Sequence, residues 1–230
     1  MDHTIHVIAR IRSDFHTKFG IPRQSGLVES LQAEVIFEPA YRSAEAVRGL
    51  EDFSHIWLLW QFSQAVRDSW SPTVRPPRLG GNRRLGVFAS RSPFRPNPIG
   101  LSCVRLEGVE LRGGQGPILH VRGADLLDGT PIYDIKPYIP YADAHPEAAG
   151  GFTDTAVRRR LTVDCPGHLL RLAPEAKRQA LLGILAEDPR PSYQDDPQRV
   201  YGLAFAGTDV RFTVSGDTLT VVEIVPAEDR

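Results

Sequence analysis

The sequence predicts a mainly β protein with a larger N-terminal domain and a small α+β C-terminal domain. Three observations support this prediction. Strand-like segments follow one another as far as residue 135, stretches rich in glycine and proline separate them, and beyond Pro166 one helix-like segment precedes three more strand-like ones. We therefore expect an N-terminal domain over residues 1–145, a connector over 146–165 and a C-terminal domain over 166–230.

Alternating or continuous apolar residues predict the strands of the N-terminal domain. These segments are residues 5–11, 31–37, 56–62, 85–89, 101–111, 118–121 and 132–135. The continuous apolar run at 56–62, which holds two tryptophans, is typical of a strand buried on both faces. Ser43 is placed to cap a short helix that ends at Gly49, and the glycines at 113–116 predict a hairpin turn.

The C-terminal domain has one predicted helix. Pro174 suits its first turn, an apolar face follows, and the helix ends near Asp188. The apolar face consists of Leu181, Ile184 and Leu185. Residues 201–205, 210–214 and 219–225 then predict three short strands.

Composition excludes several classes of protein. With 230 residues, 41% of them hydrophobic and 24% charged, the chain is globular rather than disordered, collagen-like or coiled-coil. No apolar run approaches the ~20 residues that span a bilayer, and residues 1–4 lack the features of a signal peptide. Only two cysteines occur, which is typical of a reducing compartment. We expect a cytoplasmic protein without a membrane segment.

The net charge of -1 hides a local excess of arginine. Between residues 67 and 105 the one acidic residue is Asp68, whereas the basic residues are Arg67, Arg75, Arg78, Arg83, Arg84, Arg91, Arg95 and Arg105. Such a stripe favours an anionic partner, because guanidinium groups bind phosphate in a bidentate manner. A general preference for Arg over Lys is the alternative; it explains the residue type but not the loss of acids.

The common catalytic motifs are absent. The chain has no Walker A sequence, no His-Glu-x-x-His, no Cys-x-x-Cys and no Gly-x-Ser-x-Gly. The histidines lack the spacing of metal ligands, so we expect no metal site. The glycines at 113–116 join two strands rather than a strand and a helix, which argues against a Rossmann dinucleotide site.

Three loops carry candidate functional groups. Residues 86–102 hold Arg91, Arg95 and Asn97 on a segment that three prolines stiffen, which favours a binding loop over a plain rigid turn. Residues 19–27 form a second loop punctuated by glycine and proline.

The third loop spans residues 125–143. Asp134 lies there between apolar neighbours, so its carboxylate needs a partner, either Lys136 or an arginine of the 86–102 loop. Tyr138 and Tyr141 offer flat faces on which a base can stack, although tyrosines beside prolines often serve packing alone.

These segments together resemble the TrmO-type (TsaA-like) tRNA methyltransferases. The resemblance runs along nearly the whole chain, and the run RSPFRPNPIG at 91–100 is its most specific part. The segments that carry it are 19–27 (FGIPRQSGL), 48–61 (RGLEDFSHIWLLWQ), 72–79 (PTVRPPRL), 86–102 (GVFASRSPFRPNPIGLS), 125–143 (DLLDGTPIYDIKPYIPYAD) and 188–191 (DPRP).

The resemblance implies a non-Rossmann methyltransferase with a β-barrel N-terminal domain that acts as a homodimer. Its members use S-adenosylmethionine to methylate N6 of N6-threonylcarbamoyladenosine next to the anticodon of tRNA. By position, the implied cofactor-binding residues are Ser25, Gly26, Leu27, Ser63, Gln64, Arg91, Leu101, Asp125, Leu126, Leu127 and Asp128.

Chemistry adds two further predictions to this resemblance. The acceptor nitrogen loses a proton during methylation, so a carboxylate or tyrosine is expected nearby, and Asp134 or Tyr138 is the candidate catalytic residue. The arginine stripe is expected to contact tRNA phosphates, through Arg75, Arg78, Arg83 and Arg84.

Two other functions fit the same residues. A non-enzymatic tRNA-binding module would use the arginines and tyrosines without the cofactor. A small-molecule methyltransferase or a halogen-type S-adenosylmethionine enzyme would bind the cofactor and ignore tRNA.

Overall fold

A computed structural model describes residues 3–76, 83–155, 160–191 and 196–227. Six antiparallel strands form a closed barrel in the order β1-β2-β7-β6-β3-β8. These strands are β1 (Ala9–Arg12), β2 (Gln32–Phe37), β3 (His55–Gln61), β6 (Ile99–Arg112), β7 (Gly116–Arg122) and β8 (Pro131–Pro137). The mainly β prediction is confirmed, and closure means that the sheet leaves no unpaired edge.

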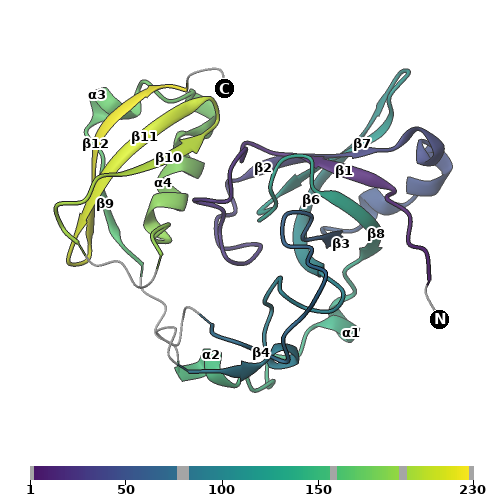
Figure 1. The fold of residues 1–230 in the computed structure, drawn as a ribbon. Coiled ribbons are helices and arrows are strands. Elements are labelled where there is room, and N and C mark those ends of the chain that lie inside the picture. Colours follow the sequence, from purple (N-terminus) through teal and green to yellow (C-terminus); the bar gives the residue numbers. More distant parts are fainter. Residues whose placement is uncertain (1–2, 77–82, 156–159, 192–195, 228–230) are drawn as a thin grey trace.

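The C-terminal part is a four-stranded sheet in the order β10-β11-β12-β9, with α4 (Arg178–Ala186) packed on it. Its strands are β9 (Thr162–Asp164), β10 (Tyr201–Phe205), β11 (Thr208–Ser215) and β12 (Thr218–Pro226). Because β9 pairs with β12 in parallel, this sheet starts inside the segment 146–165 that the sequence suggested as a connector. The barrel and the C-terminal sheet lie side by side (Figure 1).

Short elements fill the connections. A two-stranded ribbon, β4 (Thr73–Val74) with β5 (Leu85–Gly86), stands between β3 and β6. The short α-helices are α1 (Pro140–Asp143), α2 (Phe152–Thr155) and α3 (Gly167–Leu170). The 3-10 helices are Pro39–Tyr41, Ala44–Val47, Leu50–Asp52, Val87–Ala89 and Glu175–Lys177.

Several element predictions need correction. The first strand begins at Ala9 rather than residue 5, because pairing with β8 starts there and Ile5 is exposed. The segment after Ser43 is a 3-10 helix, which Ser43 flanks without a side-chain capping bond. Residues 85–89 form only a two-residue strand and a 3-10 turn.

The strand over residues 56–62 was predicted to be buried on both faces, which is wrong. In β3 every second side chain faces the barrel interior, whereas Trp57 and Leu59 on the outer face are only half-buried. The barrel core covers the inner face, whereas on the outer face Trp57 contacts only the Tyr138 ring and the Asp143 carboxylate among the interactions of the described residues and stays partly exposed. The continuous apolar run therefore reports a partly uncovered surface rather than a sheet enclosed on both sides.

The molecule has two hydrophobic cores, one inside the barrel and one in the C-terminal part. Phe15, Val28 and Leu31 belong to the long connection between β1 and β2, yet they pack with α4 and the C-terminal strands. Gly20 in this connection has φ +91°, and a Cβ there would lie 2.1 Å from Cδ1 of Leu203. The connection is thus wedged against the C-terminal sheet, which fixes one wall of the cavity described next.

Candidate functional site

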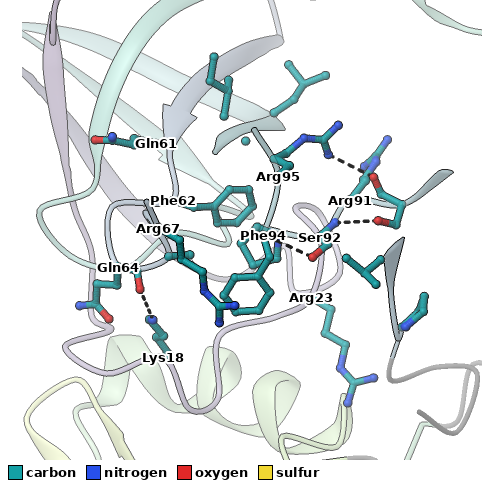
Figure 2. Close-up of a pocket in the computed structure, with 18 of the residues that line it drawn as sticks. Lys18, Arg23, Gln61, Phe62, Gln64, Arg67, Arg91, Ser92, Phe94 and Arg95 are labelled. Atoms are coloured by element: carbon teal, nitrogen blue, oxygen red, sulfur yellow. Dashed lines mark hydrogen bonds between the residues drawn. The ribbon is translucent and has the colours of Figure 1, made fainter. Parts of the chain in front are cut away.

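One large cavity, of about 1360 Å³, opens between the barrel and the connection that follows β1. Its walls come from the β1–β2 connection, the end of β3, the start of β6, and the segment 62–98, which we call the arm (Figure 2). Phe152 of α2 also lines it. Pockets for a single small ligand are usually about 300–1,000 Å³, so this cavity has room for more than one.

The inner wall of the cavity is a buried hydrogen-bonded chain. Nε1 of Trp60 donates to Oγ of Ser102 at 2.9 Å, and this hydroxyl donates to Oδ1 of Asp125 at 2.6 Å. Ser102 is buried within the barrel. A Cβ at Gly100 would lie 2.4 Å from Cε2 of Trp60, so only glycine lets the indole lie flat at this position. β3 and β6 thus fix the direction in which the Asp125 carboxylate points.

Asp125 has an unusual electrostatic environment. Burial raises the pKa of this carboxyl above its ordinary value, and the Ser102 hydroxyl, backbone N–H groups at Asp125 and Ser25, and the Arg91 charge act against that rise. Hydrogen bonds to the ionised form stabilise the charge. The carboxylate therefore needs these donors, or a cationic ligand, to stay ionised in its buried place.

The proline-rich loop over residues 91–101 is braced by its own side chains. Oγ of Ser90 accepts from the Ser92 N–H, Oγ of Ser92 accepts from the Phe94 N–H, and Arg95 donates to the Ser90 carbonyl at 3.2 Å. Arg91 hydrogen-bonds the side chain of Gln24 across the cavity. Figure 2 shows Arg91, Ser92 and Arg95 close to one another, with Phe94 beside Ser92. The loop thus presents its arginines to the cavity in fixed positions.

The cavity is strongly basic. Among the residues that the structure describes, its only carboxylate belongs to Asp125. Its basic side chains are Lys18, Arg23, Arg67, Arg75, Arg84, Arg91 and Arg95. Such a lining suits a ligand with phosphate groups together with a smaller one that carries a positive charge.

Six of the cofactor-binding residues implied by the resemblance line the cavity. They are Ser63, Gln64, Arg91, Leu101, Asp125 and Leu127. Ser25 contributes through its backbone, which hydrogen-bonds the Asp125 carboxylate. The structure therefore brings residues 91–101 and 125–127 together, although they are far apart in the sequence.

The remaining four lie elsewhere. Gly26 and Leu27 face a second hollow of about 740 Å³ beside α4. Leu126 is buried in the barrel core, and the Asp128 carboxylate accepts the backbone N–H of Ser13 at 2.9 Å. These four residues therefore do not line the cavity.

The candidate catalytic residues lie on the outer face of the barrel. Asp134 pairs with Lys136 at 2.9 Å, which confirms one of the two partners that the sequence left open. The Tyr138 ring packs 5.8 Å from the ring of Trp57. Neither residue lines the cavity of its own chain, so their catalytic role stays a prediction.

Of the four predicted tRNA-binding arginines, Arg75 and Arg84 line the cavity and Arg83 is exposed beside Arg84. Arg78 lies outside the described residues. Among the described residues, no ion pair involves Arg75, Arg83 or Arg84. Their charges are thus available to a partner.

Sequence reasoning missed several residues of the cavity. Trp60 and Ser102 were interpreted only as strand residues, Lys18, Trp70 and Phe94 received no role, and Arg67 was counted only as part of the arginine stripe. The alternation of β6 places Ser102 on the inner face, and its role depends on partners in β3 and after β7. No local pattern in the sequence reports such a contact.

In the described part of the chain, no group of three or more His, Cys, Asp and Glu side chains is arranged to hold a metal ion. No helix in that part is long and apolar enough to cross a membrane.

Comparisons with known proteins agree with this architecture. Residues 10–144 match the family model for the tRNA-methyltransferase O N-terminal domain, and residues 168–227 match the TrmO C-terminal domain. A crystal structure of TrmO from Pseudomonas aeruginosa superposes with a TM-score of 0.80 at 38% identity, covering 99% of this chain and 98% of that one.

Two bacterial relatives match over almost their whole length. The tRNA (adenine(37)-N6)-methyltransferase of Escherichia coli K12 is 42% identical over 227 residues, which is 95% of this chain and 96% of the relative. A putative S-adenosylmethionine-dependent methyltransferase, RcsF, of Pseudomonas aeruginosa is 44% identical over 227 residues, covering 92% and 93%.

Proposed function

We propose a specific reaction for this chain, which belongs to the TrmO family of tRNA methyltransferases. The chain transfers a methyl group from S-adenosylmethionine to N6 of adenine in tRNA, and the acceptor is N6-threonylcarbamoyladenosine next to the anticodon of threonine tRNA. Its relatives are named for adenine-N6 methylation and for S-adenosylmethionine, which disfavours the non-enzymatic binding module.

The observation that carries the proposal is the meeting of the 91–101 loop with Asp125 in one cavity. A buried carboxylate held by Ser102 fits the ammonium or the ribose hydroxyls of the cofactor. Arg91 fits the cofactor carboxylate, and Leu101 and Leu127 offer apolar surface to the adenine. The residues present thus match the chemistry of S-adenosylmethionine.

When bound, S-adenosylmethionine supplies a methyl group on a sulfonium sulfur, from which the methyl leaves by in-line displacement. The protein contributes mainly by positioning, since correct orientation of two reactants removes several kcal/mol from a barrier. The hydrogen-bonded side chains of Trp60, Ser102 and Asp125 position the cofactor on one side of the cavity. The basic arm binds the tRNA on the other side. The volume of about 1360 Å³ has room for the cofactor together with the acceptor nucleotide of the tRNA.

The same proposal includes a homodimer that uses the outer face of β3, β6 and β8. Exposed antiparallel strands normally carry polar side chains, yet this face carries Leu59 and, at its border with the cavity that they also line, Ile99 and Leu101, which are 37% and 49% exposed. Asp134 pairs in register with Leu59. A general-base role for Asp134 or Tyr138 therefore requires a second copy that brings its cavity against this face.

The reaction is tested by mass spectrometry of nucleosides from threonine tRNA, before and after incubation with the protein and S-adenosylmethionine. The expected result is conversion of N6-threonylcarbamoyladenosine to its N6-methyl form. Methylation of unmodified adenosine instead, in tRNA that lacks the threonylcarbamoyl group, contradicts the proposed acceptor. No transfer to any tRNA contradicts the proposed function as a whole.

The dimer is tested by light scattering of Leu59→Lys, which places a charge in the proposed contact. A monomer is expected where the unaltered chain is a dimer, with Leu172→Lys, a substitution at another exposed apolar position, as the control. If Leu59→Lys remains a dimer, the outer face of β3, β6 and β8 is not the contact.

A further inference from the structure

The arm carries three exposed aromatic side chains, in contrast to the buried Trp60 of β3. Trp60 at the base of the cavity is 7% exposed, Phe94 is 42%, Trp70 is 51% and Phe88 is 73%. The Trp70 and Phe88 rings form a pair with centroids 6.1 Å apart. Large apolar side chains that cluster on a surface mark a site of interaction, whereas scattered ones do not.

The exposure of this pair is built into the local fold. β4 and β5 pair in register, Thr73 with Gly86 and Val74 with Leu85, and the Val87 N–H donates to the Pro72 carbonyl at 2.9 Å. Val87 is 1% exposed, so the 3-10 turn that buries it directs the next side chain, Phe88, outward. The ribbon thus places Phe88 beside Trp70, and the two rings are held rather than left loose.

The charges around the pair identify the kind of partner. Arg67 lies with its guanidinium carbon 3.8 Å from the centre of the Phe94 ring. Arg75 directly follows β4, Arg84 directly precedes β5, and both are exposed. No ion pair among the described residues neutralises them. A second copy of this chain would bring like charges together here, which disfavours self-association through this surface.

We propose that Trp70 and Phe88 form a stacking platform for an unpaired base of the RNA substrate, at the mouth of the cavity. Single-stranded nucleic acid combines flat rings with phosphates, and proteins bind it with exposed aromatic rings beside arginines. The surface has both features, and Trp70 itself lines the cavity. The platform holds a base next to the acceptor nucleotide, so that the acceptor can leave the stack and enter the cavity.

This inference rests on the proposed function, because it assigns a surface to the same tRNA substrate. The experiment compares Trp70→Ala, Phe88→Ala and the double variant with the unaltered protein. The control is Leu172→Ala, which removes an exposed apolar side chain from the C-terminal part. Trp70→Phe keeps a ring and provides a rescue.

Steady-state methylation with varied tRNA is the primary measurement. The KM for tRNA is expected to rise about tenfold in the double variant and less in each single one, since stacking contributes per base. Trp70→Phe is expected to restore most of the affinity. The affinity for S-adenosylmethionine and the thermal midpoint should stay unchanged, because both side chains are exposed and lie away from the buried inner wall.

Two results overturn the platform. One is a KM for tRNA in the double variant within twofold of the unaltered value. The other is a loss of tRNA affinity that accompanies a change of oligomeric state in light scattering, which assigns the surface to a second copy of the chain.

Failure of the proposed function gives a different result. If the unaltered protein methylates no tRNA, filter binding of an isolated anticodon stem–loop replaces the kinetic measurement. A tenfold weaker binding by the double variant then supports the platform, and equal binding overturns it.

Discussion

The inner wall and the arm of the cavity hold their side chains in opposite ways. On the inner wall, Trp60, Ser102 and Asp125 belong to or adjoin barrel strands, and their polar atoms satisfy one another within the buried interior. On the arm, Trp70 and Phe88 are exposed, and a short ribbon with few backbone hydrogen bonds carries them.

This difference explains how one cavity can bind two ligands. A buried network fixes a small ligand with precise contacts but tolerates little change. An exposed surface of rings and cations binds a large flexible ligand by additive contacts, each of which contributes modestly. Substitutions on the inner wall should therefore alter the affinity for S-adenosylmethionine, and substitutions on the arm should alter the affinity for tRNA.

The largest effect is expected from Asp125→Ala. It removes the only carboxylate that lines the cavity within the described residues and leaves the Ser102 hydroxyl without its acceptor. Hydrogen bonds to charged groups contribute about 1.5–3 kcal/mol, so the Kd for S-adenosylmethionine should rise roughly 100-fold in calorimetry. Binding of tRNA should stay unchanged. Asp209→Ala, on the C-terminal sheet, is the control; an equal loss of tRNA affinity in Asp125→Ala would show that the two sides are not separate.

Ser102→Ala is expected to lower the affinity for S-adenosylmethionine, and the size of this loss should depend on pH. The Ser102 hydroxyl lowers the pKa of Asp125, which burial raises, so its removal moves that pKa further up. When the pH is lowered, a carboxyl with a raised pKa is protonated earlier than an ordinary one. The neutral form no longer binds a cation. The Kd should be higher than that of the unaltered protein, and the ratio of the two Kd values should grow as the buffer is changed from alkaline to acidic.

Calorimetry of Ser102→Ala across this pH range needs a buried hydroxyl elsewhere as its control. Thr208→Ala provides it, since the Thr208 hydroxyl donates to the Phe205 carbonyl at 2.8 Å within the C-terminal sheet. A ratio of Kd values that does not change with pH would mean that Ser102 only fills space.

On the arm, neutralising Arg75, Arg78, Arg83 and Arg84 should weaken tRNA binding about tenfold. Each phosphate contact that is lost also removes roughly one unit from the dependence of log K on log salt. The affinity for S-adenosylmethionine should not change. Filter binding at several salt concentrations measures both quantities, with Arg211→Gln in the C-terminal sheet as the control. A salt slope equal to that of the unaltered protein would show that these side chains do not contact phosphate.

The smallest effect is expected from Trp60→Phe. It removes the indole N–H that donates to Ser102 but leaves the Ser102–Asp125 hydrogen bond and most of the ring in place. A neutral hydrogen bond contributes about 1 kcal/mol, so the Kd for S-adenosylmethionine should rise roughly threefold to fivefold. A loss as large as that of Asp125→Ala would place the indole itself in contact with the ligand.

The two sides also differ in how far the sequence predicts them. Alternation along β6 and β7 predicts those strands nearly to their ends, because one face of each meets the barrel core. The sequence of the arm shows only that this segment is rich in prolines and arginines. Which rings pair across β4 and β5 depends on the register of two-residue strands, and Phe88 has no local pattern that marks it as exposed.

Contacts between distant segments account for the rest of what the sequence did not show. Asp125 carries no distinguishing neighbours in the chain, and its partners Ser102 and Ser25 come from other parts of the fold. Phe15 resembles any loop aromatic until the C-terminal strands are seen to pack on it. The resemblance to the family found the loops of the cavity and Asp125, because their residue types recur in order, but not the hydrogen bonds that connect Asp125 to Ser102 and Ser102 to Trp60.

Amide hydrogen exchange, measured with each ligand in turn, decides whether the inner wall and the arm bind different ligands, since it reports both sides of the cavity at once. S-adenosylmethionine alone should slow exchange in residues 91–101 and 123–127 together, and an anticodon stem–loop should slow it in 62–76 and 83–90. Protection by S-adenosylmethionine confined to residues 26–30 and 179–186, around the smaller hollow, would contradict the account.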